Sequence, residues 1–192
     1  RDKFYIPMVN GKDSIYFTGN SLGLQPKTTQ EYVLDELEDW ANYGVEGHFH
    51  ARNPWVSYHE MFPDLLTEII GAKPEEIVVM NQLTVNLHLL MTSFYRPTKE
   101  RYKIICEAKA FPSDQYAFAS QALLHGLDPE KTVIEVSPRE GEHVIHTEDI
   151  LAAISEHGKE TALVLFSGVN YYSGQVFNME AICKAAHDAG AY

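Results

Sequence analysis

Two kinds of hydrophobic pattern alternate along most of the chain: short apolar runs and longer helical repeats. The short runs predict buried strands at 77–80, 103–106, 132–136 and 163–166. The longer repeats predict helices at 83–94, 113–125, 147–157 and 178–189. The first of these helices is apolar on nearly all sides, so we expect it in the core. Strands that alternate with helices predict an α/β fold, a mainly parallel sheet with helices on both faces.

The part of the chain before this alternation has a different pattern. It predicts a short strand at 15–18, a helix at 26–43, a loop at 44–50 and a helix at 55–70. Gly44 and Gly71 are the expected ends of the two helices. Apolar residues on one face of the first helix predict a buried side: Val33, Leu37, Trp40 and Ala41. Acidic residues around the rest of it predict a solvated surface: Glu31, Asp35, Glu38 and Asp39.

Composition narrows the class of protein. The 192 residues are 45% apolar and 22% charged, enough for one sizeable core. A formal net charge of −12, without a basic stripe, disfavours nucleic acid as a partner. No apolar run reaches the ~18 residues that indicate a membrane span. The two cysteines, Cys106 and Cys183, predict buried free thiols in a reducing compartment, and hence a cytoplasmic protein.

The carboxyl ends of the predicted strands are where a parallel α/β sheet binds its ligands. After residue 80, the predicted helix starts near Thr84, and its first backbone N–H groups are unpaired and could bind an anion. Alternatively, Asn81 and Thr84 only cap the helix. After residue 106, the Phe111 ring is placed to stack on a planar heterocycle; alternatively it lies in the core. Ser113 is a candidate helix N-cap, and Asp114 lies in the first helical turn. After residue 166, the polar, glycine-spaced segment 167–174 is a candidate binding loop.

The sequence gives weak support to two other kinds of site. His48 and His50 would share one face of a strand and could bind a metal, but no third ligand is evident. Ser, His and Asp residues are present without a G-x-S-x-G elbow, which disfavours a hydrolytic triad.

Five segments resemble the kynureninases, enzymes of fold type I that depend on pyridoxal 5'-phosphate (PLP). The segments follow one another in the family's order and spacing, and the similarity covers essentially the whole chain. They are Tyr16 to Pro26, Gly44 to Phe49, Asn81 to Met91, Phe111 to Asp114 and Phe166 to Tyr172.

The resemblance implies roles for individual residues. Leu83 and Thr84 would contact the PLP phosphate, and Phe111 would stack on the pyridine ring. The full set of implied cofactor-binding residues is Leu83, Thr84, Phe111, Pro112, Ser113, Asp114 and Ser167. Ser21 and His48 would bind the aromatic end of the substrate, and Asn170 and Tyr172 would lie near the site.

The resemblance also implies an activity. It is hydrolysis of L-kynurenine, or 3-hydroxykynurenine, to anthranilate or 3-hydroxyanthranilate and L-alanine, in tryptophan breakdown and NAD synthesis, by a homodimer. One alternative is another fold type I enzyme, an aminotransferase or a cysteine desulfurase, against which the Ser21 and His48 segments argue. A second alternative is a fragment that catalyses nothing or only binds a partner.

Some functional residues of the family have no counterpart in this sequence. The aspartate that pairs with the pyridinium nitrogen, a histidine near the phosphate and the Schiff-base lysine all fall beyond Tyr192 in the family's order, as does the small C-terminal domain. Lys103 and Lys109 do not match the family's lysine motif. We therefore expect a chain cut at both ends, with an N-terminal arm and helix at 1–50 and an incomplete PLP-binding domain at 51–192. We expect it to contain no catalytic residue and to be inactive alone.

Overall fold

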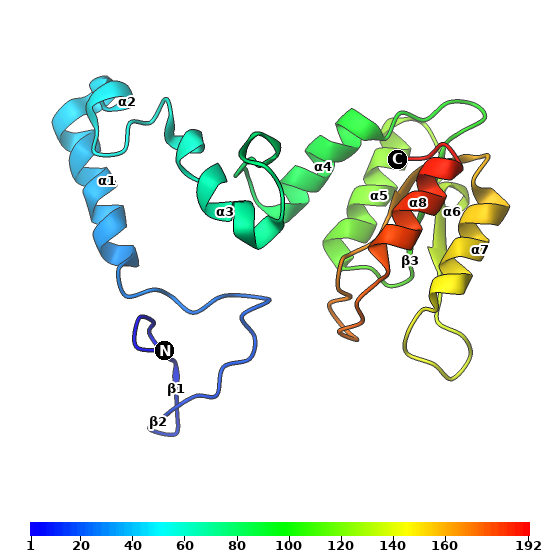
Figure 1. The fold of residues 1–192 in the computed structure, drawn as a ribbon, viewed down its shortest axis with the longest axis horizontal. Helices are drawn as coiled ribbons and strands as arrows, with labels where there is room; N and C mark the ends of the chain where they lie inside the picture. The colour runs from blue at the N-terminus through cyan, green and yellow to red at the C-terminus, as the bar shows by residue number, and fades with distance from the viewer. The chain divides into compact units, whose positions relative to one another are not determined.

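The computed structural model describes residues 1–192 and divides them into two compact units, Arg1–Val79 and Met80–Tyr192 (Figure 1). Each unit is described by itself. The predicted domains at 1–50 and 51–192 concern the whole protein and stay a prediction. None of the helices combines the length and the apolar character that a membrane crossing requires.

The second unit is built on a three-stranded parallel sheet with the strand order β4-β3-β5. Its strands are β3 (Lys103–Glu107), β4 (Val133–Val136) and β5 (Thr161–Leu165). Its helices are α4 (Leu83–Phe94), α5 (Pro112–Leu124), α6 (Pro129–Thr132), α7 (Thr147–His157) and α8 (Met179–Asp188). The predicted parallel sheet is thereby confirmed.

Helices cover both faces of this sheet. Successive side chains of a strand point to opposite faces, so Ile104 and Cys106 face one way and Ile105 the other. Ile104 and Cys106 belong to a buried cluster with Met91 of α4 and Phe118 of α5. On the opposite face, Ile105 packs in a second cluster with residues of α7 and α8. The chain therefore has the predicted layers, with α4 and α5 on one side and α7 and α8 on the other.

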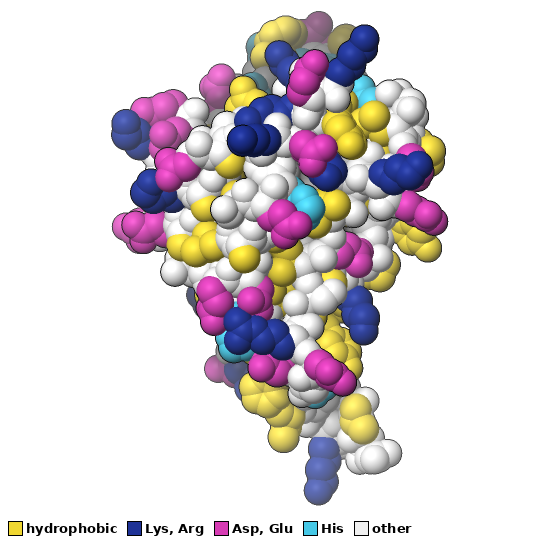
Figure 2. Space-filling view, turned by 90° about the vertical axis from the view of Figure 1, so that its right-hand side faces the viewer, with side chains coloured by type: hydrophobic (Ala, Val, Ile, Leu, Met, Phe, Trp, Pro, Cys, Tyr) yellow, Lys and Arg dark blue, Asp and Glu magenta, His cyan; other side chains and the backbone are white.

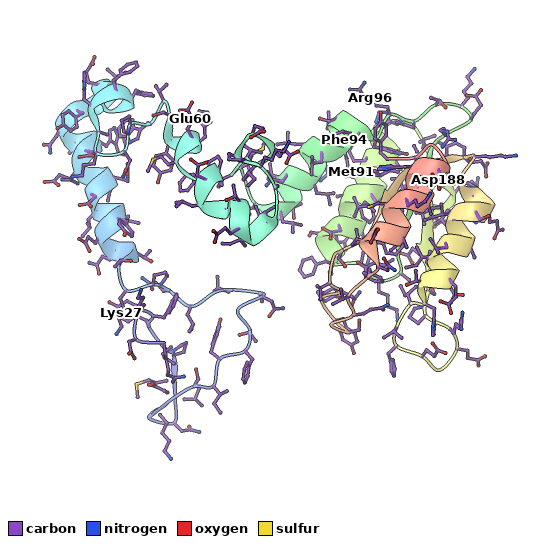
Figure 3. All side chains as sticks on the ribbon, viewed as in Figure 1. Lys27, Glu60, Met91, Phe94, Arg96 and Asp188 are labelled. Carbon is purple, nitrogen blue, oxygen red and sulfur yellow. The ribbon has the colours of Figure 1, made fainter.

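Three predictions about this part of the chain are wrong. Residues 77–80 form no strand. In α4, Met91 is buried whereas Phe94 is 46% exposed (Figure 3), because α5 covers only one side of that helix within the unit. Cys106 is buried as expected, but Cys183 is exposed on α8. Acidic and basic side chains are interspersed on the face shown in Figure 2.

The first unit contains a hairpin, the 15-residue helix α1 and several shorter helical elements. Its strands β1 (Met8–Val9) and β2 (Lys12–Asp13) pair antiparallel. Its helical elements are α1 (Thr29–Tyr43), η1 (Gly44–Glu46), α2 (Gly47–His50), η2 (Tyr58–Met61), α3 (Pro63–Ile70) and η3 (Pro74–Glu76). The predicted strand at 15–18 and the predicted loop at 44–50 are wrong, and the helix predicted at 55–70 begins at Pro63. Gly44 and Gly71 do end their helices.

Of the acidic residues of α1 that were predicted to be solvated, Glu31 and Glu38 are exposed, whereas Asp39 is buried and binds another part of the chain. Asp39 is only 2% exposed and accepts a hydrogen bond from the Arg52 backbone N–H at 2.7 Å. Glu36 accepts hydrogen bonds from Asn53 and from Trp55 Nε1, each at 3.0 Å. The predicted buried side is open instead, with Trp40 at 65% exposure. Hydrogen bonds and ion pairs therefore join α1 to the segment at 52–55.

A single arginine ties together the ends of three elements in the second unit. The Arg101 guanidinium donates to the carbonyl oxygens of Gly158 (3.0 Å), Thr161 (2.8 Å) and Ala189 (2.7 Å). Gly158 and Ala189 are the C-caps of α7 and α8, and Thr161 begins β5. Helix C-termini leave carbonyl groups without intrahelical partners, which this side chain satisfies.

We expect Arg101→Ala to lower the free energy of unfolding of the second unit by about 2–4 kcal/mol, because hydrogen bonds from a charged donor contribute about 1.5–3 kcal/mol each and the carbonyls lose their partner. Urea denaturation would measure the loss. Arg96→Ala is the matched control, since Arg96 makes one local hydrogen bond, to the Ser93 carbonyl, at an exposed position. Equal stability of the two variants would contradict this role of Arg101.

Candidate functional site

A buried carboxylate lies at the carboxyl end of the central strand. Glu107 is the last residue of β3 and is 3% exposed. Its Oε1 accepts hydrogen bonds from the Ser167 backbone N–H (3.2 Å) and from the Ser167 hydroxyl. Its Oε2 accepts from Asn170 Nδ2 at 2.6 Å. Ser167 and Asn170 follow β5, so the ends of two neighbouring parallel strands meet at this carboxylate, at the edge where α/β sheets bind ligands.

The loop after β5 is ordered by the Asn170 side chain. Asn170 Oδ1 accepts hydrogen bonds from Tyr172 N (3.0 Å), Ser173 N (2.9 Å) and Ser173 Oγ (3.0 Å). This pattern is an Asx turn, which fixes a tight bend without regular secondary structure. The turn therefore joins the buried Glu107 to the exposed tip of the loop.

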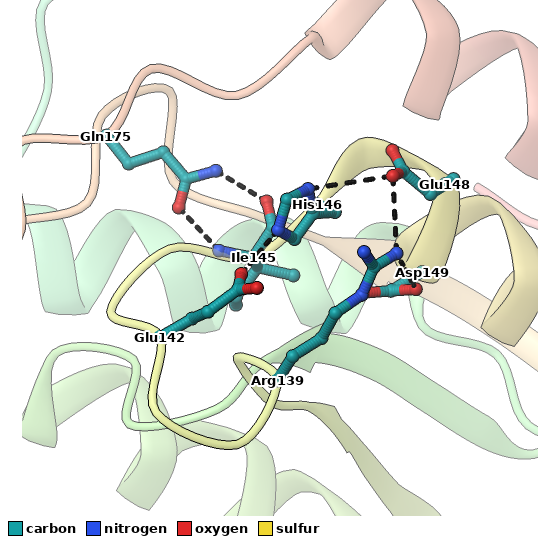
Figure 4. Close-up of polar contacts among 7 residues, drawn as sticks. All are labelled: Arg139, Glu142, Ile145, His146, Glu148, Asp149 and Gln175. Carbon is teal, nitrogen blue, oxygen red and sulfur yellow. Dashed lines mark hydrogen bonds and ion pairs between the residues drawn. The ribbon is translucent and has the colours of Figure 1, made fainter.

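The same loop is also anchored to the segment before α7 (Figure 4). The Gln175 side chain accepts from Ile145 N at 2.9 Å and donates to Ile145 O at 2.6 Å. Next to this contact, His146 lies between Glu142 and Glu148. Arg139 pairs with Asp149 through two hydrogen bonds of 2.8 and 2.9 Å, which hold the pKa of Asp149 below its usual value. The loop at 167–174 is thus fastened at both ends.

Phe111 stands in the connection between β3 and α5 rather than in the core. Its ring is 50% exposed and meets the Tyr171 ring edge-on, with centroids 5.1 Å apart. The connection is tight: Lys109 has φ +54°, a left-handed conformation that is uncommon for residues other than glycine. Pro112 begins α5 with Phe111 as its N-cap, so the prediction that Ser113 caps this helix is wrong. An exposed ring supported by an aromatic edge is free to stack on a planar ligand.

Asp114 lies in the first turn of α5, and its carboxyl group has a perturbed pKa. Burial raises the pKa of Asp114, a hydrogen bond from the Ser113 hydroxyl (3.4 Å) lowers it, and the nearby charge of Glu107 raises it further. The net direction is upward. Asp114 and Glu107 therefore make this end of the sheet electrostatically favourable for a hydrogen-bond donor or a cation.

The start of α4 lies at the same end of the sheet. His88 of α4 contacts Gln121 of α5 at 3.0 Å, and Tyr95 meets His125 edge-on at 5.5 Å. The earlier residue of α4 contacts the earlier residue of α5, and the later residue contacts the later one. The two helices therefore run in the same direction. Because α5 starts just after the carboxyl end of β3, the first turn of α4 also faces that end.

This first turn offers free backbone donors. Gln82 is the N-cap of α4 and makes no side-chain capping hydrogen bond. The N–H groups of Leu83 and Thr84 have no acceptor within the helix, as in the first turn of any α-helix. Such a helix start, with the positive end of its dipole exposed, suits an anion such as a phosphate.

The two candidate substrate residues lie in the first unit. Ser21 belongs to an exposed turn in which its N–H donates to Thr18 O at 2.9 Å. His48 lies in α2, where Nδ1 is 2.8 Å from Val45 O and the ring meets Trp55 edge-on at 5.4 Å. Since His48 and His50 are on a helix, the shared strand face considered for a metal does not exist.

Trp55 determines where the His48 ring lies. Its ring rests on Gly47, where an added Cβ would come within 2.5 Å of Trp55 Cη2. A residue with a side chain therefore cannot replace Gly47 without displacing the indole. Glu36 fixes the other side of the ring by accepting its Nε1 hydrogen bond.

Two residues of the site were not recognised in the sequence, Glu107 and Tyr171. The only local signal for Glu107 is a carboxylate that ends a buried strand directly before a loop. Tyr171 lies within the predicted binding loop, but its contact with Phe111 depends on two loops meeting across the sheet edge.

The parallel sheet covered by helices on both faces is the fold of the type I PLP-dependent class. A cystine C–S lyase in complex with its product cysteine persulfide has the same fold, with a TM-score of 0.69 and 16% identity over 88% of this chain and 42% of that one. The chain belongs to the aminotransferase class-V family, which matches residues 15–192.

Curated relatives resemble the whole chain more strongly. The kynureninase of Christiangramia forsetii is 60% identical over 192 residues, and that of Flavobacterium psychrophilum is 61% identical over 191. The mouse kynureninase is 48% identical over 204 residues. Each alignment covers 100% of this chain but only 44–45% of the relative, so the chain spans a little under half of the length of these proteins.

The cofactor of this family is PLP, and the residues present fit it. The uncapped start of α4 suits its phosphate, and the exposed Phe111 ring suits its planar heterocycle. Glu107 and Asp114 place carboxyl groups at the same edge, and these would suit a cationic or hydrogen-bond-donating group of a bound cofactor.

We expect Glu107→Gln to lower the pKa of Asp114, because the substitution removes a negative charge that disfavours the ionised carboxyl. Burial persists in the variant, so the pKa stays above its ordinary value. NMR titration of the side-chain carboxyl carbon would measure the change. Glu135→Gln, on the neighbouring strand β4, is the control and should leave Asp114 unaffected. An identical Asp114 titration in both variants would rule out the coupling.

Proposed function

We propose that the whole protein carrying this chain is a kynureninase, a PLP-dependent hydrolase that acts on a carbon–carbon bond. It cleaves L-kynurenine, or 3-hydroxykynurenine, to anthranilate, or 3-hydroxyanthranilate, and L-alanine. The observation that carries this proposal is the 48–61% identity to proteins named kynureninase over all of this chain, including the segments of Ser21 and His48.

The proposed roles of the cofactor-binding residues rest on the family resemblance, and the geometry of the site supports them. The N–H groups of Leu83 and Thr84 bind the phosphate, and Phe111 stacks on the ring, supported by Tyr171. Other cofactor contacts are assigned to Pro112, Ser113, Asp114 and Ser167. PLP supplies an electron sink for bond cleavage next to the amino-bearing carbon of the substrate. The protein residues fix its orientation, and thereby the bond that is broken.

Ser21 and His48 are assigned to the aromatic end of the substrate. The contacts of the exposed His48 ring with Trp55 and with the Val45 carbonyl favour this role, because a binding side chain is effective when its neighbours restrict its orientation. We also propose that the whole protein is a cytoplasmic homodimer in tryptophan catabolism and NAD biosynthesis. These assignments rest on the family resemblance.

The whole protein, supplied with PLP and L-kynurenine, is expected to form anthranilate, which fluorescence detects directly. His48→Phe keeps an aromatic ring against Trp55 but removes the ring nitrogens. Its KM for kynurenine should rise about tenfold, the equivalent of one lost hydrogen bond. His50→Phe, in the same short helix, is the matched control.

Other outcomes of this assay would point to different chemistry. Amino-group transfer to a 2-oxo acid, or sulfide release from cysteine, without anthranilate would replace the proposed reaction by that of an aminotransferase or a desulfurase. No turnover of any of these substrates by a PLP-loaded whole protein would favour a non-catalytic role.

The lysine that binds PLP is expected outside residues 1–192. Lys103 is 14% exposed and pairs with Glu160 at 2.7 Å, at the opposite end of β3 from the site. Borohydride treatment of the 192-residue chain with PLP, followed by peptide mapping, should therefore leave no single lysine modified in stoichiometric yield. In the whole protein the same treatment should modify one lysine. Specific modification of Lys109, which lies beside the site, would refute this expectation.

A further inference from the structure

Glu107 has a set of contacts that the proposed roles do not explain. It is nearly fully buried at the end of the central strand, and both of its oxygens accept hydrogen bonds from the loop after β5. All of these donors are uncharged groups. Burying a carboxylate without a cation is costly and is tolerated when hydrogen bonds satisfy its oxygens. The arrangement therefore indicates a specific task for this carboxylate.

The hydroxyl of Ser167 is the group most constrained by Glu107. A serine hydroxyl has one proton to donate and two lone pairs that accept. In this structure the Ser167 proton is directed to Glu107 Oε1, as is the Ser167 backbone N–H. What remains for a ligand is the pair of lone pairs on Oγ. The direction of the Ser167 hydroxyl is therefore set by Glu107.

Asn170 transmits the same constraint to the loop. Its Nδ2 donates to Glu107 Oε2, and its Oδ1 accepts the three hydrogen bonds of the Asx turn. Its carbonyl oxygen is thus committed to the protein itself, which makes Asn170 a link between Glu107 and the loop. Tyr171, the next residue, supports the Phe111 ring.

We propose that Glu107 is a positioning residue: it fixes the direction of the Ser167 hydroxyl at the cofactor site, and it holds the Asn170 turn in place. The inference rests on the proposed function, since it takes Ser167 as a cofactor contact. Neither the hydroxyl direction nor the turn depends on the identity of the amino acid substrate.

Glu107→Gln in the whole protein tests this role. The amide keeps the size of the carboxylate but replaces one accepting oxygen by a donating NH2, so either Ser167 or Asn170 loses its acceptor. PLP binding is expected to weaken about tenfold, the loss of one hydrogen bond. The pH at which the absorbance of bound PLP changes should also move. Glu135→Gln, the same change on β4, should alter neither measurement.

A double-mutant cycle separates positioning from general stability. Ser167→Ala should weaken PLP binding by a similar factor, and the double variant should bind PLP no more weakly than either single variant, because both remove the same contact. Ser167→Thr, which keeps a hydroxyl, should retain the affinity. Losses that multiply in the double variant, or an unchanged affinity and spectrum in Glu107→Gln, would overturn the proposal.

The role of Glu107 remains testable if Glu107→Gln does not fold, and also if the whole protein does not act on kynurenine. If Glu107→Gln does not fold, full PLP affinity in Ser167→Ala would overturn the proposal, whereas loss in Ser167→Ala with retention in Ser167→Thr would support it. PLP titration needs no turnover of kynurenine. A whole protein that binds PLP but forms no anthranilate would therefore contradict the proposed function and leave the role of Glu107 open to the same measurement.

Discussion

The burial of β3 on both faces is the constraint on which the second unit depends. Ile104, Ile105 and Cys106 are at most 1% exposed, so helices must cover both sides of the strand. Parallel neighbours on both edges then bring the carboxyl ends of the strands together. The site is a consequence of this arrangement: Glu107 ends the buried strand, and the loops that begin there and after β5 have to meet in front of it.

The parts of the fold that the sequence predicted well are those specified by local signals. Helix α7 has the predicted bounds, because an amphipathic repeat runs up to a terminal glycine. The strands predicted at 15–18 and 77–80 are absent, because a strand needs a partner and an apolar run does not specify one. The β1–β2 hairpin was overlooked although Asn10-Gly11, with φ of 52° and 74°, is a recognised hairpin turn.

The candidate site was predictable in position but not in its internal contacts. Topology places the segments after residues 106 and 166 at one edge of the sheet, because they follow the neighbouring strands β3 and β5. The same argument for the segment after residue 80 relied on a strand at 77–80 that is absent. The alternative of a core position for Phe111 fails because its ring is half exposed. The hydrogen bonds of Glu107 could not be predicted, since they join residues 60 and 63 positions apart in the chain.

Helix α1 shows why an apolar stripe along a helix does not by itself predict that this face is buried. Periodicity identifies the apolar face but not the surface that covers it, and burial requires both. Within the first unit it is the polar face that has partners: Asp39 and Glu36 accept hydrogen bonds from the segment at 52–55. These bonds hold Trp55 against Gly47 and His48. The acidic face of α1 therefore serves the candidate substrate histidine, a role that no count of apolar positions could reveal.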